Sequence, residues 1–197
     1  MYPKSFINVK EFFEKLPGVG KKNAERFTYA LLEKEQSVLD EIAKDISNLK
    51  KNVKYCRECH IMTDEQTCSI CSSEKRNKNV VCVVNSTKDA LAIERLGEYE
   101  GVYHILSGEI SPSRGVMPED LYLDDLLNKI NKGVEEIILA TNPTMDGEMT
   151  AMYISKLFED KPVRITRLAH GLPMGAYVDY TDDLTLLKAF KGRQVIK

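Results

Sequence analysis

The sequence contains no apolar run that approaches the roughly 20 residues of a membrane-spanning helix. Residues 1–12 have no apolar core of the kind that a secretory signal requires. These two absences exclude membrane and secreted proteins from our expectations and favour a reducing, cytoplasmic compartment. A chain of 197 residues in that setting is expected to form one or two small domains with a metal-binding insert.

Several residues that could suggest catalysis or cofactor binding lack the partners they need. His104 and His170 have no evident Ser or Cys partner, so we expect both to be structural. Gly18 and Gly20 do not form a dinucleotide-binding loop, because no strand precedes them and the third glycine is absent. Arg114 lies in a predicted loop and is expected to be solvated.

Charge is unevenly distributed, although the net charge is only −2. Residues 1–34 hold seven Lys or Arg against four Glu, and residues 50–78 hold seven basic against four acidic residues. Residues 79–197 instead hold thirteen basic against eighteen acidic residues. The basic excess near the start of the chain suggests a polyanionic partner.

The most distinctive feature that is present is a set of four cysteines with the spacing Cys56-x2-Cys59-x8-Cys68-x2-Cys71. Each CxxC turn supplies two thiolates, and two such turns complete a tetrahedral Zn(II) site. Four thiolates leave no position for water, so the zinc is expected to be structural and not catalytic. A pair of disulfides is the alternative, which a reducing compartment disfavours.

Two residues near these ligands have simpler interpretations. His60 directly follows a cysteine, but four thiols already complete the site, so we expect its ring to face solvent. Cys82 lies in an apolar run, residues 80–84, and is expected to be a buried core thiol.

Two short helices are predicted on either side of Pro17-Gly18-Val19-Gly20, the second running from Lys21 to about Leu32. Their apolar residues recur at helical spacing: Val9, Phe12, Phe13 and Leu16 in the first, and Ala24, Phe27, Ala30 and Leu31 in the second. Residues 16–27 closely resemble the helix-hairpin-helix DNA-binding motif.

The residues of this hairpin suit phosphate binding. Gly18 and Gly20 have no Cβ, so backbone amides can approach a phosphate at the start of the second helix, where Lys21 also lies. Lys22 and Arg26 are one turn apart and can flank the same strand. Such contacts predict DNA binding without sequence readout. The alternative is a packing corner between two helices with a solvated basic face.

Beyond the cysteines, short β-branched runs predict strands at residues 80–84, 102–106, 137–140 and 163–168. Amphipathic segments near residues 89–96, 121–130 and 149–158 predict the intervening helices. This alternation implies a mostly parallel sheet with flanking helices. The expected fold class is therefore α/β, built from an N-terminal helix-hairpin-helix, a four-cysteine zinc finger and this sheet.

Candidate functional side chains follow the predicted strands. Parallel sheets gather ligands at the carboxyl ends of their strands, which directs attention to Asn85, Ser86 and Asp89, and to Asp146 and Glu148. The last three are carboxylates that could hold Mg(II). The alternative for Asp146 and Glu148 is favourable acidity at the start of a helix.

This half of the chain resembles the Toprim domain of topoisomerases, primases and some nucleases. In that domain a Glu after the first strand and a later pair of acids carry the metal chemistry. The pair corresponds to Asp146 and Glu148, but Asn85 stands where the Glu is usual. An amide cannot transfer a proton near neutral pH and adds no charge to a cation site.

Taken in order, the modules resemble the RecR recombination mediator family over essentially the whole chain. The strings that support the resemblance are Leu16-Pro-Gly-Val-Gly, the four cysteines, Gly108-Glu-Ile-Ser-Pro, Ala140-Thr-Asn-Pro-Thr-Met-Asp-Gly-Glu-Met-Thr-Ala, Arg167-Leu-Ala-His-Gly-Leu-Pro-Met-Gly, Thr185-Leu and Gly192-Arg193. The resemblance implies four parts: residues 1–53 with the hairpin, 54–78 with the zinc finger, 79–175 with the Toprim domain, and 176–197 for oligomer contacts.

The resemblance also implies a function. Members of the family act in bacterial DNA repair, where they pair with RecO and RecF and help load RecA onto single-stranded DNA at gaps. They form homodimers and tetrameric rings thought to clamp DNA, with hairpin residues such as Lys22 and Arg26 facing the hole. Thr185, Leu186 and Leu187 would take part in ring closure. Asp89, Asp146 and Glu148 would face RecO or a metal, and a nucleoid-associated location is implied.

Two other functions remain open on the sequence alone. A Mg(II)-dependent Toprim nuclease or related DNA-processing enzyme is one, and Asn85 with the lack of an evident nucleophile argues against it. A zinc-stabilised interaction module without a DNA role is the other, and the basic hairpin argues against that.

Overall fold

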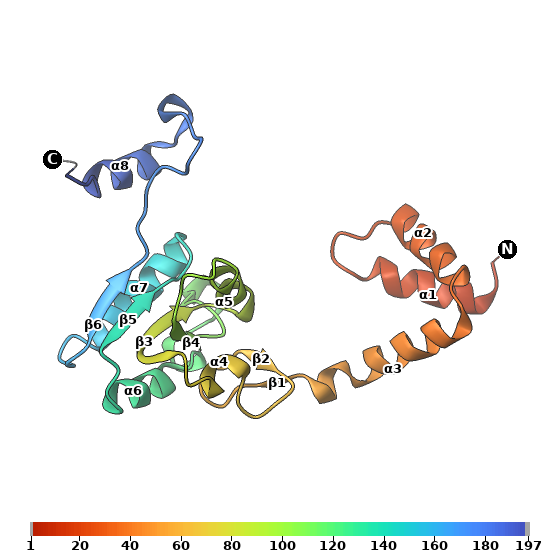
Figure 1. Cartoon of the computed structure of the whole chain (residues 1–197). Helices are drawn as coiled ribbons and strands as arrows, with labels where there is room; N and C mark the ends of the chain where they lie inside the picture. The colour runs from red at the N-terminus through yellow and green to blue at the C-terminus, as the bar shows by residue number, and fades with distance from the viewer. Residues whose placement is uncertain (1, 196–197) are drawn as a thin grey trace. The chain divides into compact units, whose positions relative to one another are not determined.

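The computed structural model describes residues 2–195 of the chain, which divides after Val53 into two compact units (Figure 1). No helix within residues 2–195 combines the length and the apolarity that crossing a bilayer demands.

The first unit consists of three helices, α1 (Lys4–Glu14), α2 (Lys21–Leu32) and α3 (Gln36–Asn52). α1 and α2 pack around Phe6, whose ring stacks on Tyr2 at 4.5 Å and meets Tyr29 edge-on at 4.9 Å. Ala24 and Thr28 of α2 complete this small core. The predicted helix-hairpin-helix is therefore confirmed, although α1 begins and ends earlier than its apolar pattern indicated.

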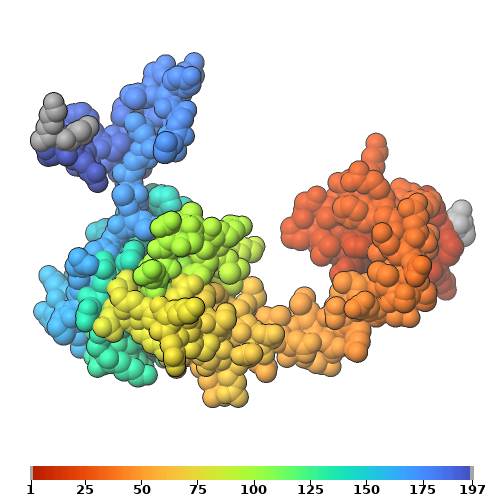
Figure 2. Space-filling view, viewed as in Figure 1, coloured from red at the N-terminus to blue at the C-terminus, as the bar shows by residue number. Residues whose placement is uncertain are grey.

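The second unit begins with a small element that we call the cysteine knuckle (residues 54–72). It contains two short antiparallel strands, β1 (Lys54–Tyr55) and β2 (Met62–Thr63), and a single helical turn, α4 (Ser69–Ser72). In the space-filling view the knuckle is continuous with the part of the unit that contains the main sheet (Figure 2).

The main sheet has four strands, β3 (Asn77–Val84), β4 (Gly101–Ile105), β5 (Glu136–Leu139) and β6 (Arg164–Arg167). All are parallel, in the order β4-β3-β5-β6. Helices α5 (Thr87–Glu94), α6 (Leu123–Asn131) and α7 (Met145–Leu157) connect them. The predicted strands and the parallel sheet are confirmed, and α7 begins four residues before its predicted start at residue 149.

Side chains alternate between the two faces of the sheet, as the period of a strand requires. One face, which includes Val81, Val83 and Ile137, packs against α6 and α7. The opposite face includes Cys82 and Val84, and it packs against α5 and the cysteine knuckle. The knuckle thus forms part of a layer that covers the sheet, and the prediction that Cys82 is a buried thiol is confirmed.

β4 is an edge strand whose outer side is covered by two hydrogen bonds. The Ile105 N–H donates to the Cys59 carbonyl oxygen at 2.8 Å, and the Lys129 ammonium of α6 donates to the Tyr103 carbonyl oxygen at 3.0 Å. Residues two apart on a strand present their backbone groups to the same side. The knuckle and α6 therefore both close this edge of the sheet.

Beyond β6 the chain forms a short turn, Val178–Tyr180, and then α8 (Asp183–Lys191), neither of which contains a buried residue. Lys188 of α8 donates to Glu148 of α7 at 2.8 Å. The segment expected to make oligomer contacts, residues 176–197, ends in two residues that lie outside the described range.

Candidate functional site

The four cysteines of the knuckle are brought together by two tight turns. Cys56 and Cys59 lie on the turn after β1, where the His60 N–H donates to the Cys56 carbonyl oxygen at 2.9 Å. Cys68 caps α4, and its Sγ accepts from the Cys71 N–H at 3.5 Å. The four Sγ atoms all lie within 4.8 Å of one another. Three of the four residues are buried, and Cys71 is half-buried.

This geometry fits tetrahedral zinc. With Zn–S bonds of about 2.3 Å, sulfurs at neighbouring corners are about 3.8 Å apart, and the Cys59 and Cys68 Sγ atoms are 3.6 Å apart. The Cys68 N–H also lies 3.3 Å from the Cys56 Sγ, an arrangement that stabilises thiolate charge. All the cysteines are free, so the disulfide alternative is wrong. The knuckle is a structural zinc site, because sulfur occupies every coordination position.

His60 does not face solvent as the sequence suggested. Its backbone has a φ of 62°, in the left-handed region, and its side chain contacts α6. The ring stacks on Tyr122 at 3.8 Å, and Nε2 lies 2.9 Å from a carboxylate oxygen of Asp125. His104, as expected, is a buried structural residue, and burial lowers its pKa to about 3. Sequence spacing could not reveal the contacts of His60, because its partners lie more than 60 residues away along the chain.

The glycine hairpin ends in an uncapped helix start. Gly18 has a φ of 78°, which favours glycine, and Gly20 is the N-cap residue of α2. Gly20 has no side chain that could cap α2, so the first backbone amides of the helix receive no side-chain hydrogen bond from the N-cap residue. Lys21, Lys22 and Arg26 are the cations nearest this start, and within residues 2–195 none of them forms an ion pair with a carboxylate. This arrangement suits an anion at the start of α2.

The carboxyl ends of β3, β4 and β5 surround a second candidate site. A cavity of about 580 Å³ there is lined by residues that include Asn85, Asp89 and Glu109. Asp89 forms a capping box at the start of α5, where it accepts from the Ser86 N–H at 2.9 Å and from the Ser86 hydroxyl at 2.8 Å. Its position is therefore explained by the helix alone.

Asn85 lies beside a carboxylate that the sequence analysis did not single out. Its Nδ2 donates to Glu109 Oε1 at 2.5 Å, while its buried Oδ1 has no hydrogen-bond partner among the described residues. Glu109 also approaches the start of α7, where a Cβ on Gly147 would lie 2.8 Å from Glu109 Oε1 and closer still to the Asn142 carbonyl oxygen. The only sequence signal for Glu109 was its place in the string that begins at Gly108.

Asp146 and Glu148 lie in the first turn of α7, and each is held by cations. Asp146 pairs with Arg114 at 2.7 Å; the Arg114 side chain is 64% exposed, so it is solvated as expected and also holds this carboxylate. Hydrogen bonds from Ser111 and Arg114 lower the pKa of Asp146. Glu148 is 2.8 Å from Lys188 and 2.7 Å from Arg167, and the same two residues lower its pKa.

The structure does not gather the three predicted acids into one site. Across the described range, only the knuckle cysteines form a group of three or more potential metal-ligand atoms within 4.8 Å of one another. The acids instead have local roles at helix starts and in ion pairs, which is the arrangement that favourable helix-start acidity predicts.

Four family models match the chain in succession. A RecR helix-hairpin-helix model matches residues 9–50, and a RecR four-cysteine zinc-finger model matches residues 53–73. A Toprim domain model matches residues 79–169, and a RecR C-terminal model matches residues 171–194. The chain belongs to the RecR family.

Membership of the RecR family assigns the chain a role in DNA recombination and repair. The Toprim module of RecR is of a type associated with enzymes, whereas its zinc finger is structural. The three RecR-specific matches lie on both sides of the Toprim module, so the assignment rests on the whole order of modules.

Substitution of one zinc ligand should remove the metal from this RecR protein. We expect Cys71→Ser to lose most of its zinc, since three thiolates and a hydroxyl bind the metal far more weakly. The wild type should retain about one zinc per chain through gel filtration, measured by elemental analysis. Cys82→Ala is the matched control, because it removes a core thiol that is not a ligand and should keep the zinc. Equal zinc in the two variants would contradict the ligand assignment.

Proposed function

We propose that this RecR-family chain is a recombination mediator that binds DNA as an oligomeric clamp. With RecO and RecF, it would help load RecA onto single-stranded DNA at gaps in the bacterial nucleoid. The observation that carries the proposal is the uncapped start of α2, with Lys21, Lys22 and Arg26, which form no ion pair within residues 2–195. Backbone amides and the helix dipole favour a phosphate there, and the three cations add charge without reading bases.

A single hairpin contacts few phosphates, so the clamp needs several copies of the chain. α3 supports such assembly, because none of its residues is buried within the single chain. Val38, Ile42, Ile46 and Leu49 recur along one side of this helix and are 47–60% exposed. We propose that a second copy covers this apolar stripe.

The C-terminal part offers further contact surface. On α8, Leu187 is exposed while Thr185 and Leu186 are half-buried. We propose that these residues close the ring, and that Asp89, Asp146 and Glu148 present acidic groups to RecO. Ion pairs with Arg114, Arg167 and Lys188 hold two of those acids in fixed positions.

A second candidate is a Mg(II)-dependent Toprim nuclease, which only the Toprim match favours. Its chemistry needs a cluster of carboxylates that no side-chain cation neutralises, so that they can bind a metal ion. Here Asn85 replaces one carboxylate, and cations already neutralise Asp146 and Glu148. We therefore propose that the chain performs no bond chemistry.

Removal of two hairpin cations should flatten the salt dependence of DNA binding. Each phosphate contact contributes about 0.9 to the slope of log K against log salt, so Lys22→Ala with Arg26→Ala should lower the slope by about 2 per engaged hairpin. Fluorescence anisotropy on gapped duplex DNA at several salt concentrations measures this. Lys44→Ala with Lys50→Ala on α3 removes the same charge outside the hairpin and should change the slope less. An unchanged slope in the hairpin variant would refute the placement of the DNA site.

A charged residue in the apolar stripe should weaken assembly. We expect Ile42→Glu with Ile46→Glu to weaken self-association about tenfold or more, since burying unpaired carboxylates is costly. Sedimentation velocity across a range of protein concentrations measures the association. The control is Ser47→Glu, which places the same kind of charge on the polar side of α3 and should leave assembly intact. If the stripe variant and the control assemble equally, another surface forms the interface.

End-labelled gapped duplex DNA should stay intact with excess protein in Mg(II) and in Mn(II). The expected result on a denaturing gel is full-length strands, because the acids at the sheet edge lack the free charge that metal catalysis requires. A metal-dependent nick that disappears in Asp146→Asn would favour the nuclease over the mediator. Neither outcome depends on the hairpin, so this result is independent of the salt experiment.

A further inference from the structure

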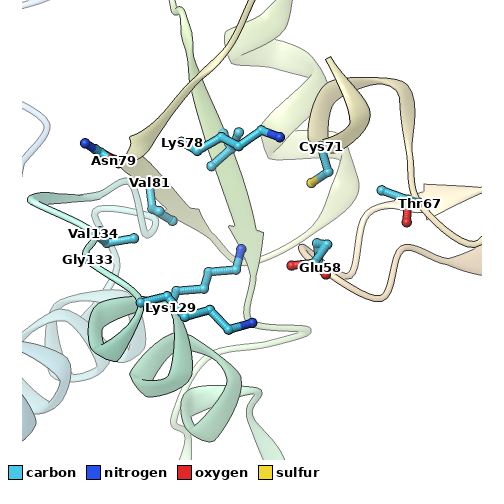
Figure 3. Close-up of a pocket in the computed structure, with 11 residues that line it drawn as sticks. Glu58, Thr67, Cys71, Lys78, Asn79, Val81, Lys129, Gly133 and Val134 are labelled. Carbon is cyan, nitrogen blue, oxygen red and sulfur yellow. The ribbon is translucent and has the colours of Figure 1, made fainter. Parts of the chain in front are cut away.

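Lys129 is a charged residue that pairs with no carboxylate among the described residues. It lies on α6, and its ammonium points into a cavity of about 420 Å³ that is also lined by Cys71 and Glu58 (Figure 3). The ammonium donates one hydrogen bond to the Tyr103 carbonyl oxygen. In the part of the chain that the structure describes, it forms no ion pair with any Asp or Glu.

Burial makes the lack of a counter-charge important. Lys129 is half-buried, and desolvation lowers the pKa of its ammonium, while the nearby Cys71, Cys59 and Glu58 act in the opposite direction. A buried cation destabilises a fold unless an anion compensates it. The other lysines of this cavity, Lys78 and Lys132, are exposed and remain hydrated. Lys129 is the least exposed of the three, so it gains most from a nearby anion.

The zinc centre, in contrast, carries an excess of negative charge. Four thiolates and one Zn(II) carry a net charge of about −2, in a knuckle whose ligands are mostly buried. Backbone N–H groups from Cys68 and Cys71 point at two of the sulfurs, but these are dipoles and not full charges. The half-buried Lys129 ammonium lines the same cavity as Cys71 and can supply the full positive charge that the dipoles do not.

We propose that the Lys129 ammonium is the counter-charge of the zinc–thiolate centre and couples zinc binding to the packing of α6 against β4. The coupling is reciprocal, because whatever Lys129 adds to zinc affinity zinc adds to the packing of α6. The charged zinc–thiolate centre exists only while zinc is bound, so loss of zinc removes the partner of Lys129 and weakens its hydrogen bond to the edge strand.

Competition with a chromophoric chelator on the full chain tests the proposal. Lys129→Met keeps the length of the stem and removes the charge, and it should weaken zinc binding by about 10- to 100-fold, the usual effect of losing an outer-shell partner. Lys132→Met is the matched control, since this lysine follows the same helix and lines the same cavity, and it should change zinc affinity less than about twofold. Lys129→Arg should restore most of the affinity. Equal zinc affinity in the Met variants would overturn the proposal.

A second measurement uses only the wild type, so it does not depend on the folding of a variant. Hydrogen exchange is followed with and without chelator, and α7 serves as an internal reference, because it packs on the same face of the sheet as α6. Residues 123–131 should lose more protection than residues 145–157 when zinc is removed. Equal loss in the two helices would show that zinc supports the fold generally and that α6 has no special link to it.

Discussion

The zinc–thiolate centre is the interaction on which the second unit depends, because its ligands belong to the hydrophobic layer over one face of the sheet. Cys56, Cys59 and Cys68 pack in the same cluster as Cys82 and Val84 of β3. A knuckle of this size has too few apolar residues to fold alone, so metal binding provides its folding energy. The sheet in turn excludes water from the sulfurs. Metal and sheet therefore stabilise each other.

Electrostatic compensation also determines the state of the acids near the carboxyl ends of the strands. Glu148 carries one negative charge and lies between Arg167 and Lys188, and Asp146 is matched by Arg114. These carboxylates lie near the carboxyl ends of the strands, but the ion pairs leave them poorly suited to hold a further cation. A Toprim fold does not by itself determine an activity, as is true of other widely used folds.

Local sequence signals predicted much of this structure, and long-range contacts account for what they missed. The strands were readable from β-branched runs, the hairpin from its glycines, and the zinc site from the spacing of the cysteines. The contact of Asn85 with Glu109 joins residues 24 apart, and that of Lys188 with Glu148 joins residues 40 apart. No periodic pattern encodes such pairs, since the fold alone brings them together. His60 was misjudged for the same reason, because its partners Tyr122 and Asp125 are distant in the sequence.

The covered edge of β4 gives the metal a part in keeping the protein from self-aggregation. An open strand edge is a template onto which another chain can add a strand. The Cys59 carbonyl oxygen and the Lys129 ammonium occupy two of the groups on that edge, and the first of them belongs to the zinc-binding knuckle. Unfolding of the knuckle would therefore expose the Ile105 N–H, which a strand from another chain could then bind.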